Sequence, residues 1–463
     1  MDYVFTDSQI EQIRDGALSI LSEIGVKLGR QELIDKLAAI GFHVSGSFVH
    51  IDKKTALKKI QSQKGDCSPS VKQPFSTSLS AYPHTYENID GSFCKITTES
   101  NAAMGNFAAN AARMLFPNTN VSCPGHPQDV APELQFFRHA VNSFVWCKDY
   151  HPMETTSIKS ALYYFELCEN MGKPITGAPI YVASPLNISG ESLDIAVKFS
   201  DRLNRVYVSS MPSFGVSTPL NLVAAYAQTL AETVGGAVIY EALTGVPAGY
   251  ATNIFAFDFY DTTLPFGTPE KLLLEWTNME VAAKVSGGEY GGPQSTDIHT
   301  NAPRCGIQAC AEKASLITAG ALLGATNFHT AGTLAMDEVF SPVQLLLDME
   351  MIAHAQKIAD GMPNENFDGD LLNEVREGLK NGYMMSDRTL DNMKNYIWRA
   401  NYFTRKTFGS YINKPFPAEI EKARAKAEAI MNMPPVWKIC DELEAEAERI
   451  YEAAKTFIFS TEI

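Results

Sequence analysis

The feature that most constrains the fold is a regular alternation of short apolar runs and longer helical patterns between about residues 174 and 360. Strands alternating with helices give a parallel sheet, either open or closed into a (β/α)8 TIM barrel. No GxGxxG or GxxxxGK[ST] phosphate loop occurs, which counts against the nucleotide-binding open sheets. We therefore predict an α/β fold of the (β/α)8 class. Strands are expected near 175–183, 206–211, 248–253, 285–289 and 326–330, and helices near 191–202, 220–243, 269–285, 304–323 and 342–360.

The segments on either side predict additions to this barrel. Residues 1–65 are expected to form a helical N-terminal cap, beginning with the capping-box pattern Thr6-Asp-Ser-Gln9. Residues 66–385 are expected to hold the barrel, with an early β-excursion and a further strand at 142–146. Residues 386–463 are charged and predict C-terminal helices packed on the barrel.

Charge and hydropathy bear on the protein's partners and on its location in the cell. The net charge of −15 disfavours nucleic acid and anionic membranes as partners. The first residues have neither a basic nor an apolar region of a signal peptide, so a cytoplasmic location is expected. Residues 206–231 and 314–336 lack charged side chains, but Pro, Gly and polar residues interrupt both stretches. We interpret them as buried strand-plus-helix units and expect no membrane span.

The cysteines give no metal or disulfide framework. Eight cysteines occur at scattered spacings without a CxxC pair, which is typical of reduced thiols in a cytosolic protein. Cys123 with His126, and Cys305 with Cys310, would each supply two metal ligands, but neither pair has a second pair nearby. No metal site is predicted.

Aromatic and polar residues gather where the predicted strands end. Phe257 and Tyr260 lie in a loop that also holds Asp258 and Asp261. Aromatic faces with nearby carboxylates bind quaternary ammonium groups, although packing rings would give the same pattern. A glycine-rich loop at 288–297 offers polar contacts, or is simply a tight turn that caps the next helix.

Other polar residues leave alternatives open. His329 at a strand end is either a ligand or acid/base group, or a buried histidine with satisfied hydrogen bonds. Asp348 and Glu350 are two apart in a predicted helix, do not share a face, and are interpreted as structural. No Ser-His-Asp set, HExxH motif or paired-carboxylate motif emerges from the spacing, so the catalytic residues are unknown.

Several segments, taken in their order along the chain, carry a family resemblance. They are 174–186, 208–219, 266–270, 287–297, 328–334 and 341–351, together with Ile20-Leu-Ser-Glu-Ile-Gly-Val26. With these segments the chain resembles the trimethylamine methyltransferase superfamily, specifically the members that lack pyrrolysine. The resemblance implies a (β/α)8 barrel that moves a methyl group from a methylated amine to the Co(I) corrinoid (cobalamin) of a separate protein. Such methyltransferases serve methanogenesis or acetogenesis.

The missing pyrrolysine bears on the substrate that the resemblance implies. Members that use trimethylamine carry that residue, so its absence favours a quaternary amine of betaine type, such as glycine betaine. A quaternary nitrogen leaves as a neutral tertiary amine, so no general acid is needed and the protein has to orient the N–CH3 bond and exclude water. We expect no tightly bound cofactor, a cognate corrinoid protein as partner, and a homo-oligomer.

Placement of the loops within this resemblance gives candidate substrate contacts. The aromatic candidates are Phe214, Phe257, Tyr260 and Tyr290, and the polar candidates are Gln294, Asp297 and His329. Two other hypotheses remain. A barrel lyase or hydrolase of another family would need a metal or a titrating carboxylate pair, and a non-catalytic quaternary-amine binding protein would bind without turnover.

Overall fold

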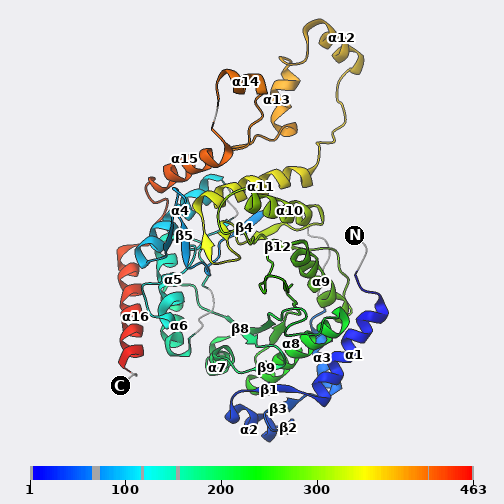
Figure 1. Cartoon of the computed structure of the whole chain (residues 1–463), viewed down its shortest axis with the longest axis vertical. Coiled ribbons are helices and arrows are strands. Elements are labelled where there is room, and N and C mark those ends of the chain that lie inside the picture. The colour runs from blue at the N-terminus through cyan, green and yellow to red at the C-terminus, as the bar shows by residue number, and fades with distance from the viewer. Residues whose placement is uncertain (1–3, 65–72, 116–118, 153–156, 416, 461–463) are drawn as a thin grey trace.

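The computed structural model describes residues 4–64, 73–115, 119–152, 157–415 and 417–460. Two parallel sheets form its centre (Figure 1). No ladder joins the two sheets within the described ranges, so the structure is α/β as predicted but is not a closed barrel there. One sheet has the order β11 (Ala248–Tyr250), β10 (Arg205–Ser210), β8 (Gly177–Val182), and the other β12 (Ser295–Asp297), β13 (Asn327–His329), β4 (Ser76–Ser78), β7 (Thr119–Asn120).

Each of the later strands is followed by a helix, as the sequence pattern predicts. Local signals fix the helix ends: the Asn221 side chain caps α8, and Gly245 ends it with a φ of 75°. Ser341 caps α11 in the same way, and Pro342 occupies its first turn. The helices are α7 (Glu191–Lys198), α8 (Leu222–Thr244), α9 (Pro269–Val285), α10 (Ile307–Leu322) and α11 (Pro342–Asp360).

Two predicted strands are wrong. Residues 142–146 belong to α5 (Pro132–Trp146), whose buried residues lie on more than one face, so a short apolar run within it resembles a buried strand. Residues 285–289 hold the end of α9 and the turn after it, and the true strand, β12, begins at Ser295. The glycines that suggested a strand end instead terminate the helix, with Gly287 at a φ of 80°.

The first part of the chain packs on α8. The predicted capping box of Thr6 and Gln9 is confirmed at the start of α1. Gly235 brings α8 close to this layer, since a Cβ there would lie 2.5 Å from Val26 Cγ2. The elements are α1 (Asp7–Glu23), β1 (Val26–Leu28), α2 (Gln31–Ala39), β2 (His43–Ser45), β3 (Phe48–His50) and α3 (Lys53–Ser62), and β1 also pairs with β9 (Asn187–Ile188).

Helix α8 is apolar on all sides. Within the part of the chain that the structure describes, it alone is long and apolar enough to cross a membrane, yet 78% of its apolar window is buried by other elements. Its neighbours include α1, α3 and β10. The uncharged stretch that contains its start is therefore core, as predicted.

A second small sheet joins the early β-excursion to the loop after β13. Its order is β14 (Thr333–Leu334), β15 (Val339–Phe340), β5 (Thr85–Glu87), β6 (Phe93–Lys95). Helices α4 (Thr98–Leu115) and α6 (Ile158–Asn170) pack beside α5, and a large hydrophobic core lies between these helices and α11.

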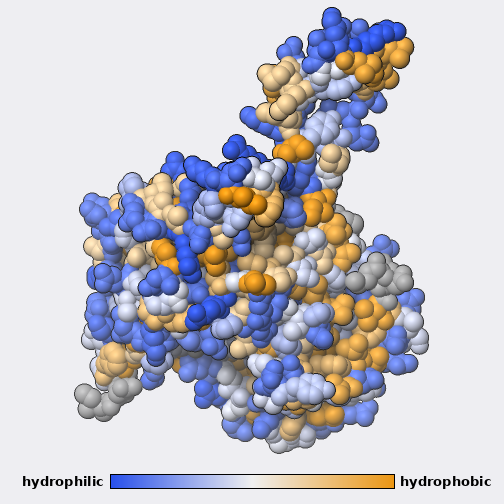
Figure 2. Space-filling view, turned by 45° about the horizontal axis from the view of Figure 1, so that its top comes forward, coloured by the Kyte–Doolittle hydropathy of each residue, from blue (hydrophilic) through white to orange (hydrophobic). Residues whose placement is uncertain are grey.

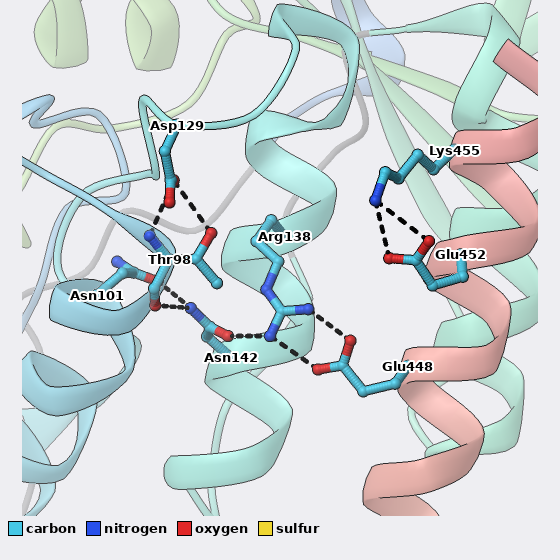
Figure 3. Close-up of polar contacts among 8 residues, drawn as sticks. All are labelled: Thr98, Asn101, Asp129, Arg138, Asn142, Glu448, Glu452 and Lys455. Carbon is cyan, nitrogen blue, oxygen red and sulfur yellow. Dashed lines mark hydrogen bonds and ion pairs between the residues drawn. The ribbon is translucent and has the colours of Figure 1, made fainter. Parts of the chain in front are cut away.

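Two C-terminal helices, α15 (Glu419–Met431) and α16 (Asp441–Ser460), pack on that core. Figure 3 shows how α16 is fixed to α5: Arg138 donates to both carboxylate oxygens of Glu448, at 2.6 and 2.7 Å. Arg138 also donates to Asn142, which in turn donates to Asn101 of α4 at 3.0 Å. A single guanidinium thus connects the last helix to a buried polar chain between α4 and α5.

Residues 361–413, which we call the arm, stand away from the rest of the molecule (Figure 1). Within these residues, all of which the structure describes, only Tyr402 is buried. Part of the predicted C-terminal helical segment therefore projects instead of packing, whereas the domain boundaries themselves stay a prediction. The arm holds α12 (Leu371–Asn381), α13 (Asp387–Tyr396) and α14 (Phe408–Asn413).

Candidate functional site

The adjacent strands β12 and β13 bring two of the predicted polar residues together. Asp297 and His329 are direct partners in the parallel ladder. Because side chains alternate along a strand, the buried Thr296 and Phe328 face the helices, and both polar residues point to the opposite face. His329 Nδ1 lies 3.0 Å from the hydroxyl of Ser78 on the next strand, β4. The carboxyl end of this sheet therefore carries a polar row.

Helix α9 supplies the charges beneath Asp297. Lys271 donates to the backbone oxygen of Asp297 and to Glu275, both at 2.6 Å, and Glu275 accepts the Asp297 N–H at 2.9 Å. Burial raises the pKa of Glu275 against the opposing effect of Lys271. Burial also opposes ionisation of Asp297, but Lys271 and the neighbouring histidines outweigh it and lower the pKa of Asp297. The Asp297 carboxylate is therefore ionised, and the residue as a whole is half-buried.

His299 is a neutral imidazole behind this carboxylate. Burial lowers the pKa of His299 to about 3, although Asp297 acts in the opposite direction. Its ring packs on Phe266 with 5.0 Å between the ring centroids. Its Nδ1 atom is buried and has no hydrogen-bond partner among the residues that the structure describes. The site thus places the ionised Asp297 beside a neutral His299.

The loop after His329 is held by a hydrogen bond to Asp348 of α11. Thr330 has a φ of 69°, a left-handed conformation that is uncommon for a threonine. Two residues on, the Gly332 N–H donates to Asp348 at 2.7 Å, and the same carboxylate oxygen accepts from Lys313 at 2.7 Å. Both charged side chains are completely buried. Asp348 is structural, as predicted, and it fixes the backbone beside the site.

The aromatic candidates lie on the loops after β10 and β11. The Phe214 N–H donates to Phe255 O at 2.9 Å, which joins these two loops. Phe214 is partly buried, and Phe257 meets Phe259 edge-on with 5.3 Å between centroids. Tyr260 is 98% exposed and points away from any packed surface.

Side-chain and backbone contacts connect these aromatic loops to the polar row. Thr263 contacts Met336 through its hydroxyl at 3.8 Å, and the Met336 N–H donates to Thr300 O at 2.7 Å. The loops that follow β10, β11, β12 and β13 therefore form one connected rim. In α/β folds this carboxyl end is where ligands bind.

Tyr290 and Gln294 lie elsewhere. Both precede β12, so they are at the amino end of the strand whose carboxyl end carries Asp297. Tyr290 lines a separate pocket of about 360 Å³ with Trp276 and Glu280 on α9. The structure does not bring these two predicted residues to the polar row.

Sequence reasoning missed Lys271, Glu275 and Ser78. Lys271 and Glu275 are four apart on a helix otherwise rich in apolar residues, and this was the available signal for a buried charge pair. Ser78 had none, because its contact with His329 spans 251 residues. Within the described ranges, no group of three or more His, Cys, Asp or Glu side chains is arranged to hold a metal ion.

Comparison with known proteins finds one matching family model and several similar methyltransferases. A family model described as trimethylamine methyltransferase (MTTB) matches residues 164–445. The chain is 25% identical over 330 residues to trimethylamine methyltransferase MttB1 of Methanosarcina mazei, covering 70% of this chain and 61% of that protein. It is 21% identical over 452 residues to the glycine betaine methyltransferase of Desulfitobacterium hafniense, covering 92% of both.

The two kinds of relative differ in the length they share with this chain. The chain spans about three fifths of the trimethylamine methyltransferase and nine tenths of the glycine betaine methyltransferase. Among solved structures, the monomethylamine methyltransferase of Methanosarcina barkeri aligns over 92% of this chain and 93% of that one, at 11% identity. Its TM-score of 0.40 is too low to support an argument about the fold.

Proposed function

The chain belongs to the trimethylamine methyltransferase family, as a member without pyrrolysine, and on that premise we propose that it is a quaternary amine–corrinoid protein methyltransferase. Its substrate would be of betaine type, such as glycine betaine, and its methyl acceptor the Co(I) corrinoid of a partner protein. The observation that carries this proposal is the match to a glycine betaine methyltransferase over 92% of both chains.

The proposed reaction needs no proton transfer. The C–N bond breaks with its electron pair going to nitrogen, which leaves as a neutral tertiary amine, and Co(I) supplies the pair for the new Co–C bond. The protein has to hold the ammonium group, aim one methyl group outward and exclude water. A neutral His299 and an ionised Asp297 suit this task better than acid/base catalysis does.

The rim at the carboxyl ends of the strands is our proposed substrate site. Asp297 would face the ammonium group, and Phe214 and Phe257 would supply aromatic faces. The His329 ring and the Ser78 hydroxyl, which lie in the same polar row as Asp297, would donate hydrogen bonds to a substrate carboxylate. We leave Tyr290 and Gln294 out of this site because they lie at the other end of β12.

We further propose that the two parallel sheets are parts of one (β/α)8 barrel. Residues 1–65 would be its cap, 66–385 the barrel and 386–463 the C-terminal helices. We also propose a soluble, cytoplasmic homo-oligomer, consistent with the burial of α8 in the core.

The test is a spectral assay with a Co(I)-loaded corrinoid protein and a panel of quaternary and tertiary amines. Loss of the Co(I) band with one quaternary amine is the expected result. Asp297→Asn should raise KM about tenfold, the equivalent of roughly 1.4 kcal/mol. The matched control is Gln294→Ala, at the other end of the same strand, which should leave KM unchanged.

Two outcomes count against the proposal. Ligand binding by calorimetry without loss of the Co(I) band with any amine would favour a binding protein. Equal effects of the two variants on KM would move the substrate site away from the carboxyl end of β12.

A further inference from the structure

The apolar helix α8 carries one buried carboxylate, Glu232. Figure 2 shows hydrophilic side chains spread over the surface of the molecule, the usual place for a carboxylate, whereas Glu232 has no exposed surface. Burial raises the pKa of Glu232, and hydrogen bonds from Gln228, Leu186 and Ser184 oppose the rise. A buried carboxylate is costly unless hydrogen bonds satisfy it, so these donors show which parts of the chain Glu232 holds.

Glu232 fixes the loop that follows β8. Its Oε2 atom accepts from the Ser184 hydroxyl at 2.7 Å, and its Oε1 atom accepts from the Leu186 N–H at 3.0 Å. Leu186 has a φ of 52°, a left-handed conformation that is uncommon for leucine, and the bond to Glu232 helps to hold it. On its other side, Leu186 O accepts from the Lys27 N–H of β1 at 2.8 Å. The loop is therefore held between α8 and the first part of the chain.

The same carboxylate reaches the loop after β10 through Gln228. Gln228 precedes Glu232 by four residues, so the two side chains share one face of α8. Gln228 Nε2 donates to Glu232 Oε1 at 2.8 Å and to Ser217 O at 2.9 Å. The Ser217 hydroxyl accepts from the Ser213 N–H at 2.9 Å, and Phe214 lies within this short turn. One carboxylate thus connects the loop after β8 to the turn that carries Phe214.

The other parallel sheet has a similar arrangement. The loop after β13 is fixed by Asp348, also completely buried, which accepts the Gly332 N–H. The turn that carries Phe214 is joined in turn to the loop after β11, because the Phe214 N–H donates to Phe255 O. Each parallel sheet therefore has a buried carboxylate behind the loops at its carboxyl end, and Glu232 extends the connected rim to β8.

We propose that Glu232 is a positioning residue of the substrate site, which holds the Phe214 ring in place through Gln228 and adds the loop after β8 to the rim. This inference rests on the proposed binding of a quaternary amine at that rim. An aromatic ring attracts an ammonium group over its face, so the orientation of the ring decides the contact. A loop that is already fixed loses little conformational freedom when a ligand binds. Glu232 therefore acts on substrate affinity without touching the substrate.

A double-variant cycle in the Co(I) assay tests the action through Phe214. Gln228→Met removes the amide that links Glu232 to the turn and leaves the bonds to the loop after β8 in place. It should raise KM for the quaternary amine about fivefold, the effect of one lost hydrogen bond, with kcat unchanged. Phe214→Ala should raise KM about tenfold, and adding Gln228→Met to it should cause no further rise. The matched control is Gln31→Met, because Gln31 also donates to an acid four residues ahead, Asp35, at 2.8 Å, but on the exposed side of α2.

Hydrogen exchange tests the same links without substrate. Exchange in residues 211–218 should become about fivefold faster in Gln228→Met, and exchange in residues 183–188 should do so in Ser184→Ala. Glu232→Gln should speed exchange in both loops. Faster exchange throughout the core would mean general destabilisation and would overturn the local role of Glu232.

Two kinetic results would also overturn the proposal: KM effects of Gln228→Met and Phe214→Ala that multiply, or an effect of Gln228→Met on kcat alone. A wild-type chain that binds the amine by calorimetry but causes no loss of the Co(I) band would overturn the proposed function alone, and the cycle would then be measured as Kd. Unchanged exchange in both loops of Glu232→Gln would overturn the inference about Glu232 alone.

Discussion

Removing one partner of the buried Lys313–Asp348 pair should destabilise the protein far more than removing one partner of an exposed ion pair with a similar N–O distance. Asp348 Oδ2 accepts from both Lys313 Nζ and the Gly332 N–H at 2.7 Å, and both charged side chains have no exposed surface. Asp348→Asn keeps the shape, but if the new NH2 group takes the place of Oδ2, two donors face a third donor and the ammonium stays buried without a counter-charge. We expect a loss of about 3–5 kcal/mol in the free energy of unfolding.

The assay is urea denaturation followed by circular dichroism and tryptophan fluorescence, with a double-mutant cycle. Lys313→Met should also destabilise, and the double variant should lose less than the sum of the two single losses, with a coupling of about 2 kcal/mol. The control is Glu32→Gln, because the Lys36–Glu32 pair has an N–O distance of 2.6 Å but lies in solvent. Its removal should not change the midpoint measurably.

Two results would refute this reasoning. An additive double variant would mean that the charges do not depend on each other. A loss below about 1 kcal/mol for Asp348→Asn would mean that water reaches Lys313.

Three further predictions concern pH, the C-terminal helix and α8. Burial lowers the pKa of His299 to about 3 and that of His139 to about 4, so between pH 7 and 5 only the unfolded chain gains these protons. As the pH falls over this range, each histidine should lower the free energy of unfolding by about 2 kcal/mol. Unfolding midpoints that do not change between pH 7 and 5 would contradict this. Arg138→Met should speed hydrogen exchange in α16 and cost about 1 kcal/mol, whereas Lys455→Met, which removes the exposed pair with Glu452, should change neither. Gly235→Val should destabilise by about 1–3 kcal/mol through overpacking against Val26, whereas Gly409→Ala in α14, with no atom within 4 Å, should not destabilise, as thermal melts of the two variants would show.

The helices that follow the later strands could be predicted because apolar residues recur at helical spacing over many residues in these segments. The strand near 285–289 was misplaced because the glycines that end α9 resemble the end of a strand. His329 was predicted at a strand end and Asp297 in the loop 288–297; Asp297 instead ends a strand, β12, and the pairing of β12 with β13 brings the two residues together. The i,i+4 spacing of Lys271 and Glu275 was a usable sign of an ion pair, but their contacts with Asp297 link residues 26 and 22 positions apart and could not be read from it. Ser78 was out of reach, because its contact with His329 spans 251 positions. A linear pattern reports which face a residue takes but does not report what meets it there.

Helix α11 has a consequence for how the two ends of the molecule are coupled. Asp348 and Glu350 are two residues apart, so they point to different sides of the same turn. One carboxylate fixes the loop beside His329, and the other fixes the root of the arm. One turn of α11 therefore anchors both the loop that follows His329 and the root of the arm.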